Sequence, residues 1–405
     1  MNENELFQVA LGIVPPWLVD RCSFVVEASR LDIYLDFPAG STFPCPDCGE
    51  QAKAYDTEAF TWRHMDFFQH RAYLHARTPR VSCSRCGIHR IVVPWARPGT
   101  GFTLLFEALV MQLAKVMTVT AAGRIVGEHD TRLWRIINHY VDLARSQADH
   151  SGVSQVGIDE TSARRGHSYV SLFVDMEERK VLFVTPGKDS ATVAAFAEDL
   201  KAHQGDPASI TEASLDMSPA FIKGVTTQLP NASITFDKFH VVGLINEAVD
   251  EVRRLERKDH PELTGSRYIW LKNQDNLTEA QKNQLATFNL PRSHLKTAKA
   301  YQIRLAFQDL YNQPAEDAKA YLNKWFYWAT HSRIPAIIDA ARSVRRHQDG
   351  ILRWFTSNLN NGILEGINSL VQAAKAKARG YRSTRNLSSI IYLIAGKLDL
   401  VCQPT

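Results

Sequence analysis

The spacing of apolar residues changes along the chain, and each change predicts a different kind of structure. From about residue 102 to 148, apolar residues recur every three or four positions, as they do on one face of a helix. After Val153 they form short runs bounded by polar turns, which is typical of strands. Helical spacing returns at about Phe239 and continues to the end of the sequence.

Short strand-like runs alternate with helical stretches between residues 153 and 237. The polar turn MEERK (176–180) joins the second and third runs into a hairpin, and helices separate the later runs. Such alternation predicts an α/β sheet. The predicted strands are VSQVGID (153–159), SYVSLFVD (168–175), VLFVTPG (181–187), ITEASLD (210–216) and ASITFD (232–237).

Two Cys-x-x-Cys pairs lie in the aromatic-rich N-terminal part of the chain. Each pair can form a tight turn that directs two thiolates to one point, and two such turns supply a tetrahedral zinc site. Gly49 and Gly87 follow the pairs, where the turn often needs a positive φ. The sequence between the pairs is strand-like, so we expect a structural zinc ribbon; two redox motifs are the alternative. The expected zinc ligands are Cys45, Cys48, Cys83 and Cys86.

The segment TVTAAGRIVGEHDTRLWRIINHYV (118–141) fits two helices around a short turn. In a helix-turn-helix motif, Arg132 and Arg135 would then be available to a DNA groove. An ordinary helical hairpin is the alternative. The residues that suit the helix ends and the turn are Thr118 or Thr120, Gly127, and Asp130 or Thr131.

These patterns divide the chain into four parts. ARPGTG (96–101) has the Pro and Gly content of a linker, and almost no strand pattern occurs from about Arg257 to Phe355. The predicted domains are an N-terminal zinc ribbon (1–99), a helix-turn-helix domain (102–148), an α/β domain (152–256 and 356–400) and an all-helical insertion (257–355).

Composition is that of an ordinary globular protein. Of the 405 residues, 45% are hydrophobic and 22% are charged, and the net charge of +4 says little about partners. No run of about eighteen apolar residues occurs, so no membrane span is expected. The first residues lack the pattern of a signal peptide. We therefore expect a cytoplasmic protein.

Carboxylates follow two of the predicted strands. Asp159 and Asp216 each end an apolar run, which is where open α/β sheets place their sites. Asp216 also suits a helix cap, so the cap is the alternative for that residue. A third acid would complete a site for divalent metals, and Glu365, on a late predicted helix, is the candidate.

A basic stretch follows Glu365. It suits the neutralisation of DNA phosphates next to a metal site, and a solvated helix end is the alternative. Its candidate DNA-binding residues are Lys375, Lys377, Arg379, Arg382 and Arg385.

The order of these motifs resembles one family over nearly the whole chain. Paired cysteines, a helix-turn-helix, GIDE, LDMS, FDKFH and NNGILEGINSL together resemble the IS-L-three family of bacterial insertion-sequence transposases. The resemblance implies an α/β, ribonuclease-H-like catalytic domain with an all-helical insertion, preceded by a zinc ribbon and a helix-turn-helix domain. It also implies an Asp-Asp-Glu (DDE) triad of Asp159, Asp216 and Glu365. DKFH resembles the acid-x-x-His motif of such families, so His240 is expected to orient a phosphate or hold Asp237; a core histidine is the alternative.

The resemblance implies chemistry on DNA. Two Mg²⁺ (or Mn²⁺) ions about 4 Å apart would activate the nucleophile and stabilise the leaving oxygen, with Asp159 bridging both ions. Water would nick the transposon end, and the freed 3′-hydroxyl would attack target DNA. The expected partners are double-stranded DNA, namely terminal inverted repeats and target, and a second copy in a homodimer or higher oligomer. The expected location is the bacterial cytoplasm, in association with the nucleoid.

Two other functions remain open from the residues alone. One is a sequence-specific DNA-binding regulator whose ribonuclease-H-like domain is inert. The other is a structure-selective nuclease with the same fold and no joining step. The presence of all three acids argues against the regulator.

Overall fold

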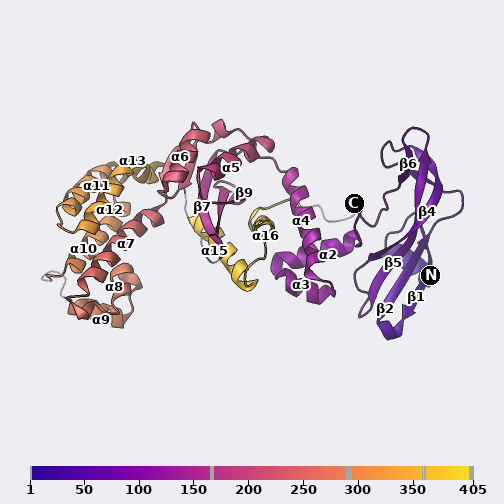
Figure 1. Cartoon of the computed structure of the whole chain (residues 1–405), viewed down its shortest axis with the longest axis horizontal. Helices are drawn as coiled ribbons and strands as arrows, with labels where there is room; N and C mark the ends of the chain where they lie inside the picture. Colours follow the sequence, from indigo (N-terminus) through magenta and orange to yellow (C-terminus); the bar gives the residue numbers. More distant parts are fainter. Residues whose placement is uncertain (1, 165–167, 289–293, 358, 360–361, 401–405) are drawn as a thin grey trace. The chain divides into compact units, whose positions relative to one another are not determined.

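A computed structural model describes residues 2–164, 168–288, 294–357, 359 and 362–400 (Figure 1). The chain divides into two compact units. The first comprises the chain up to Gln147 together with Ala374–Ile394 and the residues from Leu398, and the second comprises Ala148–Ala373 and Ala395–Lys397. Within the described ranges, no helix is both long enough and apolar enough to cross a bilayer.

A six-stranded sheet forms the N-terminal part of the first unit. Its strands follow the order β1-β2-β5-β4-β3, and β6 pairs with β5. Three buried tryptophans fill its core, and the ring of Trp95 packs edge-on against Trp17 and Trp62 at centroid distances of 4.8 and 5.6 Å. The elements are α1 (Glu3–Ala10), β1 (Leu18–Val25), β2 (Arg30–Asp36), β3 (Thr42–Pro44), β4 (Gln51–Arg63), β5 (Arg71–Cys83) and β6 (Gly87–Arg90).

The helices predicted after this sheet are present as α2 (Leu104–Val116), α3 (Val119–Val126) and α4 (Asp130–Ser146). Thr118 caps α3, and Gly127 ends it with a φ of 70° that favours glycine. The prediction that Asp130 or Thr131 caps α4 is wrong. The cap is His129, whose Nδ1 accepts the backbone N–H of Thr131, a contact that rules based on Ser, Thr, Asp and Asn do not anticipate.

A buried carboxylate anchors the predicted linker to these helices. Glu107 of α2 is fully buried, and its oxygens accept hydrogen bonds from Arg97 Nε, Thr100 Oγ1 and Tyr140 OH at 2.7–3.1 Å. A buried carboxylate is stable only when its oxygens are satisfied in this way. The segment 96–101 is therefore a fixed connection and not a loose tether.

The second unit contains a five-stranded sheet in the order β11-β10-β7-β8-β9. Strand β10 pairs in parallel with β7 and β11, whereas β7, β8 and β9 are antiparallel. The predicted strands are confirmed, and their order is that of the expected ribonuclease-H-like fold. The elements are β7 (Gln155–Arg164), β8 (Ser168–Asp175), β9 (Lys180–Pro186), α5 (Ser190–Ala202), β10 (Glu212–Leu215), α6 (Pro219–Gln228) and β11 (Ser233–Phe236).

Strand β7 is longer than predicted. The expectation that it ends at Asp159 is wrong, because β8 pairs with it from Val156 to Arg164 and keeps it extended. Asp159 consequently lies in the middle of the strand. The parallel pairing of β7 with β10, however, ends at Gly157, just before this carboxylate.

An all-helical segment follows β11, as the sequence predicts. Its core includes the fully buried Trp270, Tyr301 and Phe307. The buried guanidinium of Arg304 donates to Asn246 Oδ1 and to the carbonyl of Leu271, so its charge is satisfied inside the helical core. The helices are α7 (Lys238–Glu256), α8 (Arg267–Leu271), α9 (Glu279–Thr287), α10 (Lys296–Asp309), α11 (Ala315–Thr330), α12 (Pro335–Arg346), α13 (Gln348–Leu352) and α14 (Trp354–Ser357).

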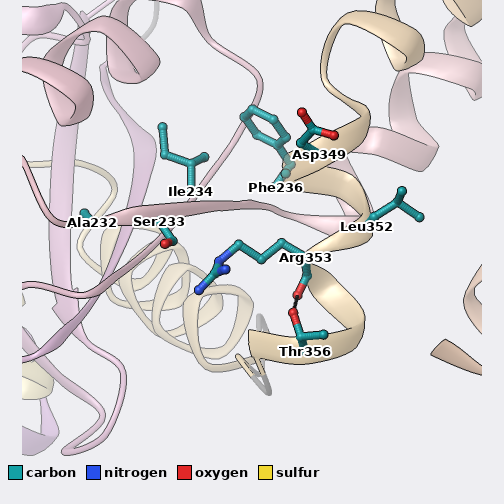
Figure 2. Close-up of a pocket in the computed structure, with 9 residues that line it drawn as sticks. Ala232, Ser233, Ile234, Phe236, Asp349, Leu352, Arg353 and Thr356 are labelled. Carbon is teal, nitrogen blue, oxygen red and sulfur yellow. Dashed lines mark hydrogen bonds between the residues drawn. The ribbon is translucent and has the colours of Figure 1, made fainter. Parts of the chain in front are cut away.

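Helix α13 returns the chain to the sheet at its edge strand β11. Gly350 allows the close approach, because a Cβ there would lie 2.6 Å from the ring of Phe236. A pocket of about 580 Å³ lies at this junction, and Figure 2 shows Arg353 in it. The Arg353 guanidinium pairs with Glu212 of β10. The C-terminal end of the helical segment is thus fixed to the sheet.

Candidate active site and metal centres

The four predicted zinc ligands converge in the first unit. The Sγ atoms of Cys45, Cys48, Cys83 and Cys86 all lie within 4.8 Å of one another. Gly49 and Gly87 follow the pairs with φ of 75° and 91°, which confirms the predicted turns. Four thiolates at this spacing fit a closed tetrahedral zinc site, so the zinc would be structural.

Backbone N–H groups prepare the first of these turns for a metal. The N–H groups of Asp47 and Cys48 hydrogen bond to the Cys45 sulfur and lower the pKa of its thiol to about 7. A thiol that ionises near neutral pH is a better metal ligand than an ordinary one. The effect is confined to Cys45, because a hydrogen bond with Cys48 and burial raise the pKa of the Cys86 thiol to about 12.

Three aspartates end up side by side on the sheet of the second unit. Gly157 of β7 pairs with Ser214 of β10, and Leu215 of β10 pairs with Phe236 of β11. Continuing both registers by one or two residues aligns Asp159, Asp216 and Asp237. Since neighbouring strands lie about 4.7–4.9 Å apart, these carboxylates form one row, which we call the acid row.

Backbone N–H groups hold each carboxylate of the acid row. Asp159 Oδ1 accepts the N–H of Glu160 at 2.7 Å, and Asp216 Oδ1 accepts that of Ser218 at 2.9 Å. Asp237 caps α7 through the N–H of Phe239 at 2.7 Å. The cap of α6 is Ser218 and not Asp216, so the helix-cap alternative for Asp216 does not apply.

Burial and neighbouring charges change how Asp159 and His240 ionise. Burial raises the pKa of Asp159 to about 6, and the negative charges of Asp237 and Asp216 act in the same direction, against the N–H of Glu160 and the charge of His240. The hydrogen bond with Asp237 raises the pKa of His240 to about 9, although burial opposes it. His240 is therefore a cation at neutral pH, with its Nδ1 3.4 Å from Asp237 Oδ2.

Helix α15 (Gly362–Lys377) runs beside β7 in matched register (Figure 1). Leu364 packs over Gly157, where a Cβ would lie only 2.7 Å from its side chain. Asn368 donates a hydrogen bond to Asp159 Oδ2, and Gln372 donates to Thr161 Oγ1. Four residues of helix rise about 6 Å, and two residues of strand rise about 6.6 Å. Because these lengths are similar, every fourth residue of α15 lies beside every second residue of β7.

Glu365 lies on this helix but not in the acid row. Its side chain is exposed. Within the described residues, neither the acid row nor the set of Asp159, Asp216 and Glu365 is among the groups of three whose ligand atoms all lie within 4.8 Å of one another. The structure therefore brings together Asp159, Asp216 and His240, and it places Glu365 on the helix that contacts Asp159.

Asn368 was not identified as a site residue from the sequence, although its spacing from Glu365 could have indicated it. It follows Glu365 by three residues, and residues at that spacing are neighbours on a helix surface. The sequence identifies Asp237 only as the acid of DKFH, whereas in the structure it is the third member of the acid row.

The predicted DNA-binding residues all belong to the first unit. Several of them make contacts within it. Arg132 pairs with Glu128 and lies over the ring of Phe102, and Lys377 Nζ donates to the carbonyl of Val116 at 2.9 Å. Arg385 pairs with Asp142 of α4 at 2.7 Å.

The remaining basic residues differ in exposure. Arg135, Arg379 and Arg382 are exposed, and Lys375 is half-buried. Two residues of the basic stretch after Glu365 thus contact α2 and α4, whereas Arg379 and Arg382 remain exposed.

A ribonuclease-H-like sheet that carries an acid row, in a chain with a cysteine zinc site and a helix-turn-helix, defines a metal-dependent enzyme of nucleic acids. Family models agree with each part. The DDE transposase model of family ISL3, described as "Transposase", matches residues 156–391. The "helix-turn-helix domain of transposase family ISL3" matches 92–141, and the "zinc-finger of transposase IS204/IS1001/IS1096/IS1165" matches 41–86.

Curated relatives match over almost their full length. The transposase for insertion sequence element IS1557 of Mycobacterium tuberculosis is 29% identical over 434 residues, covering 97% of this chain and 96% of the relative. The transposase for insertion sequence element IS1001 of Bordetella parapertussis is 29% identical over 400 residues, covering 94% and 96%. The chain belongs to the ISL3 family of transposases. It is a DDE transposase, an enzyme that binds DNA and catalyses transposition with a divalent metal.

The Asp237–His240 contact leads to a prediction about pH. In Asp237→Asn, the pKa of His240 should fall from about 9 toward its ordinary value of about 6.5, because the hydrogen bond to a carboxylate is lost. The stability that the contact provides is complete below about pH 6.5 and is lost as the pH rises through about 9. NMR titration of the His240 ring measures the pKa.

Asp317→Asn, which removes an exposed carboxylate of α11, is the control and should leave the titration unchanged. A His240 pKa that stays near 9 in Asp237→Asn would show that another group stabilises the imidazolium.

Proposed function

We propose that this transposase binds the terminal inverted repeats of its element and cleaves and joins DNA strands with Asp159, Asp216 and Glu365. These carboxylates would hold two Mg²⁺ (or Mn²⁺) ions. The observation that carries the proposal is the acid row, beside which α15 is anchored to Asp159 by Asn368. Two metal ions, when bound, activate the attacking oxygen and stabilise the leaving oxygen of a phosphodiester.

The donor set fits magnesium. Mg²⁺ prefers oxygen ligands and keeps several waters, so a few carboxylates suffice. The raised pKa of Asp159 reflects burial and the repulsion of nearby carboxylates. A cation among them would relieve that repulsion and keep Asp159 ionised. Asp159, at one end of the row and in contact with α15, would hold metal together with Asp216 and Glu365.

Glu365 joins this site by a local movement. On a helix, the Cβ atoms of residues three apart lie about 5–6 Å from each other. Asn368 already touches Asp159, so Glu365 lies one helical turn from that contact. Its exposed side chain is unrestrained by burial and can turn toward a cation. Repulsion from the acid row favours the outward position until a cation is present.

His240 supplies the positive charge of the site. Because Asp237 keeps the imidazolium protonated at neutral pH, the ring can donate a hydrogen bond to a DNA phosphate while it remains paired with Asp237. His240 would then both orient a phosphate and hold Asp237, the two roles expected from the sequence. The ring is half-exposed, so a phosphate can reach it.

DNA binding involves the basic residues of the first unit. Phosphate contacts by Lys and Arg supply most of the affinity of such proteins and make it salt-dependent. The exposed Arg135, Arg379 and Arg382 are the strongest candidates. Arg132 and Arg385 would have to exchange a carboxylate partner for a phosphate. The other proposed phosphate-binding residues are Lys375 and Lys377.

Further proposals rest on the class of enzyme. The chain works on double-stranded DNA as a homodimer or higher oligomer, because two transposon ends must be held together. It does so in the bacterial cytoplasm, on the nucleoid. We also propose the four domains predicted from the sequence. They are the zinc ribbon (1–99), the helix-turn-helix domain (102–148), the catalytic domain (152–256 and 356–400) and the helical insertion (257–355).

Glu365→Gln tests the catalytic assignment. The change removes a charge but keeps the size of the side chain, so cleavage of a transposon-end duplex in Mg²⁺ should fall by about 10³-fold or more, as for loss of a reacting-site group. Affinity for the same duplex, measured in Ca²⁺ by gel shift, should stay within about twofold. Glu316→Gln, an exposed acid on α11, is the matched control.

Two outcomes would favour other functions. Full function of Glu365→Gln would indicate a DNA-binding regulator. If the wild-type protein cleaves but forms no joined product from a pre-nicked end with a free 3′-hydroxyl in Mg²⁺, it is a nuclease without strand transfer.

Asn368→Ala tests a positioning role. The amide fixes one oxygen of the Asp159 carboxylate, and loss of a group that orients a metal ligand typically costs about 10–100-fold in activity or metal affinity. The loss should appear as a higher Mg²⁺ concentration for half-maximal activity, and saturating Mg²⁺ should partly rescue it. Ser369→Ala, the next and exposed residue, should have no effect. A loss that Mg²⁺ concentration does not change would argue for a purely structural role.

A further inference from the structure

Two imidazoles and a carboxylate meet in the second unit, away from the acid row. One potential ligand atom each from His150, Asp199 and His203 lies within 4.8 Å of the other two. His150 precedes β7, whereas Asp159 lies well along that strand, beyond its parallel pairing with β10. The cluster therefore lies at the N-terminal end of β7, and Asp159 lies further along the strand.

The chain places these groups together by local structure. Asp199 and His203 are four residues apart at the C-terminal end of α5, so they share one face of the helix. The backbone N–H of His150 donates to the carbonyl of His203 at 2.8 Å. Gly205 allows this approach, because a Cβ there would lie 2.9 Å from the carbonyl oxygen of His150.

The groups are largely withdrawn from solvent. His150 is 5% exposed, and the side chains of His203 and Asp199 are 12% and 14% exposed. His203 Nδ1 lies 2.7 Å from the carbonyl oxygen of Asp199 and 3.4 Å from Asp199 Oδ2, and both oxygens favour the tautomer that carries the ring proton on Nδ1. A ring nitrogen that donates to a backbone carbonyl is the usual arrangement of a metal-binding histidine, whose other nitrogen, here Nε2, then holds the lone pair.

We propose that His150, Asp199 and His203 form a binding site for a divalent transition-metal ion of the zinc class. Two imidazoles and one carboxylate suit Zn²⁺, Co²⁺ or Ni²⁺, whereas Mg²⁺ prefers oxygen ligands. Three protein ligands leave one position of a tetrahedral ion for water. The ion would tie the segment that leads into β7 to the end of α5, and its role is structural.

Metal content of the full-length protein tests the site. Wild type, His203→Gln and Asp199→Asn are equilibrated with excess Zn²⁺, desalted and analysed by mass spectrometry. Each variant should retain one zinc ion per chain fewer than the wild type. The control is His260→Gln, which removes an exposed imidazole that faces Glu262 at 3.0 Å; its zinc content should equal that of the wild type.

Cobalt identifies which site is lost. The cysteine site gives intense sulfur-to-cobalt charge-transfer absorption, and a nitrogen and oxygen site does not. In both variants this absorption should be unchanged while one equivalent of bound Co²⁺ disappears. Zinc content equal to that of the wild type in both variants would overturn the proposal and leave a hydrogen-bonded cluster. Asp199→Asn keeps the side-chain volume and serves if His203→Gln fails to fold. Neither outcome depends on the catalytic assignment of the acid row.

Discussion

The parallel pairing of β10 with β7 and β11 is the constraint on which the proposed chemistry depends. Its register aligns Asp159 of β7 with Asp216 and Asp237, which directly follow β10 and β11, at a spacing of about one strand per carboxylate. Such a row is electrostatically unfavourable without a cation. A positive charge near the acid row therefore stabilises the fold, and the other groups of the site supply positive charge or hydrogen-bond donors to the carboxylates.

Without metal, groups of the chain itself reduce the repulsion within the acid row. Asp159 gains protons more readily than an ordinary carboxyl group, and His240 keeps its proton up to about pH 9. Asn368 and backbone N–H groups hold the carboxylate oxygens. Helix α15 also continues into the first unit, where its basic end contacts the carbonyl of Val116. One helix thus carries both Glu365 and the first basic residues that follow it.

Much of this was predictable from the sequence, because periodicity, turn residues and cysteine spacing are local. The strands, the insertion and the zinc ligands follow from them. Long-range contacts could not be predicted. The pairing with β8 extends β7 past Asp159, His129 rather than Asp130 caps α4, and the side chains of Arg132 and Arg385 pair with acids. Asn368 was missed because its partner is more than two hundred residues away.

The central claim is that Asp159, Asp216 and Glu365 share two divalent cations. The most direct measurement is a crystal structure of the transposase with Mn²⁺ and a transposon-end duplex, with the ions located by anomalous scattering. We expect two manganese peaks about 4 Å apart, with oxygens of these three residues as ligands. Manganese held by Asp159, Asp216 and Asp237 while Glu365 stays in solvent would contradict it.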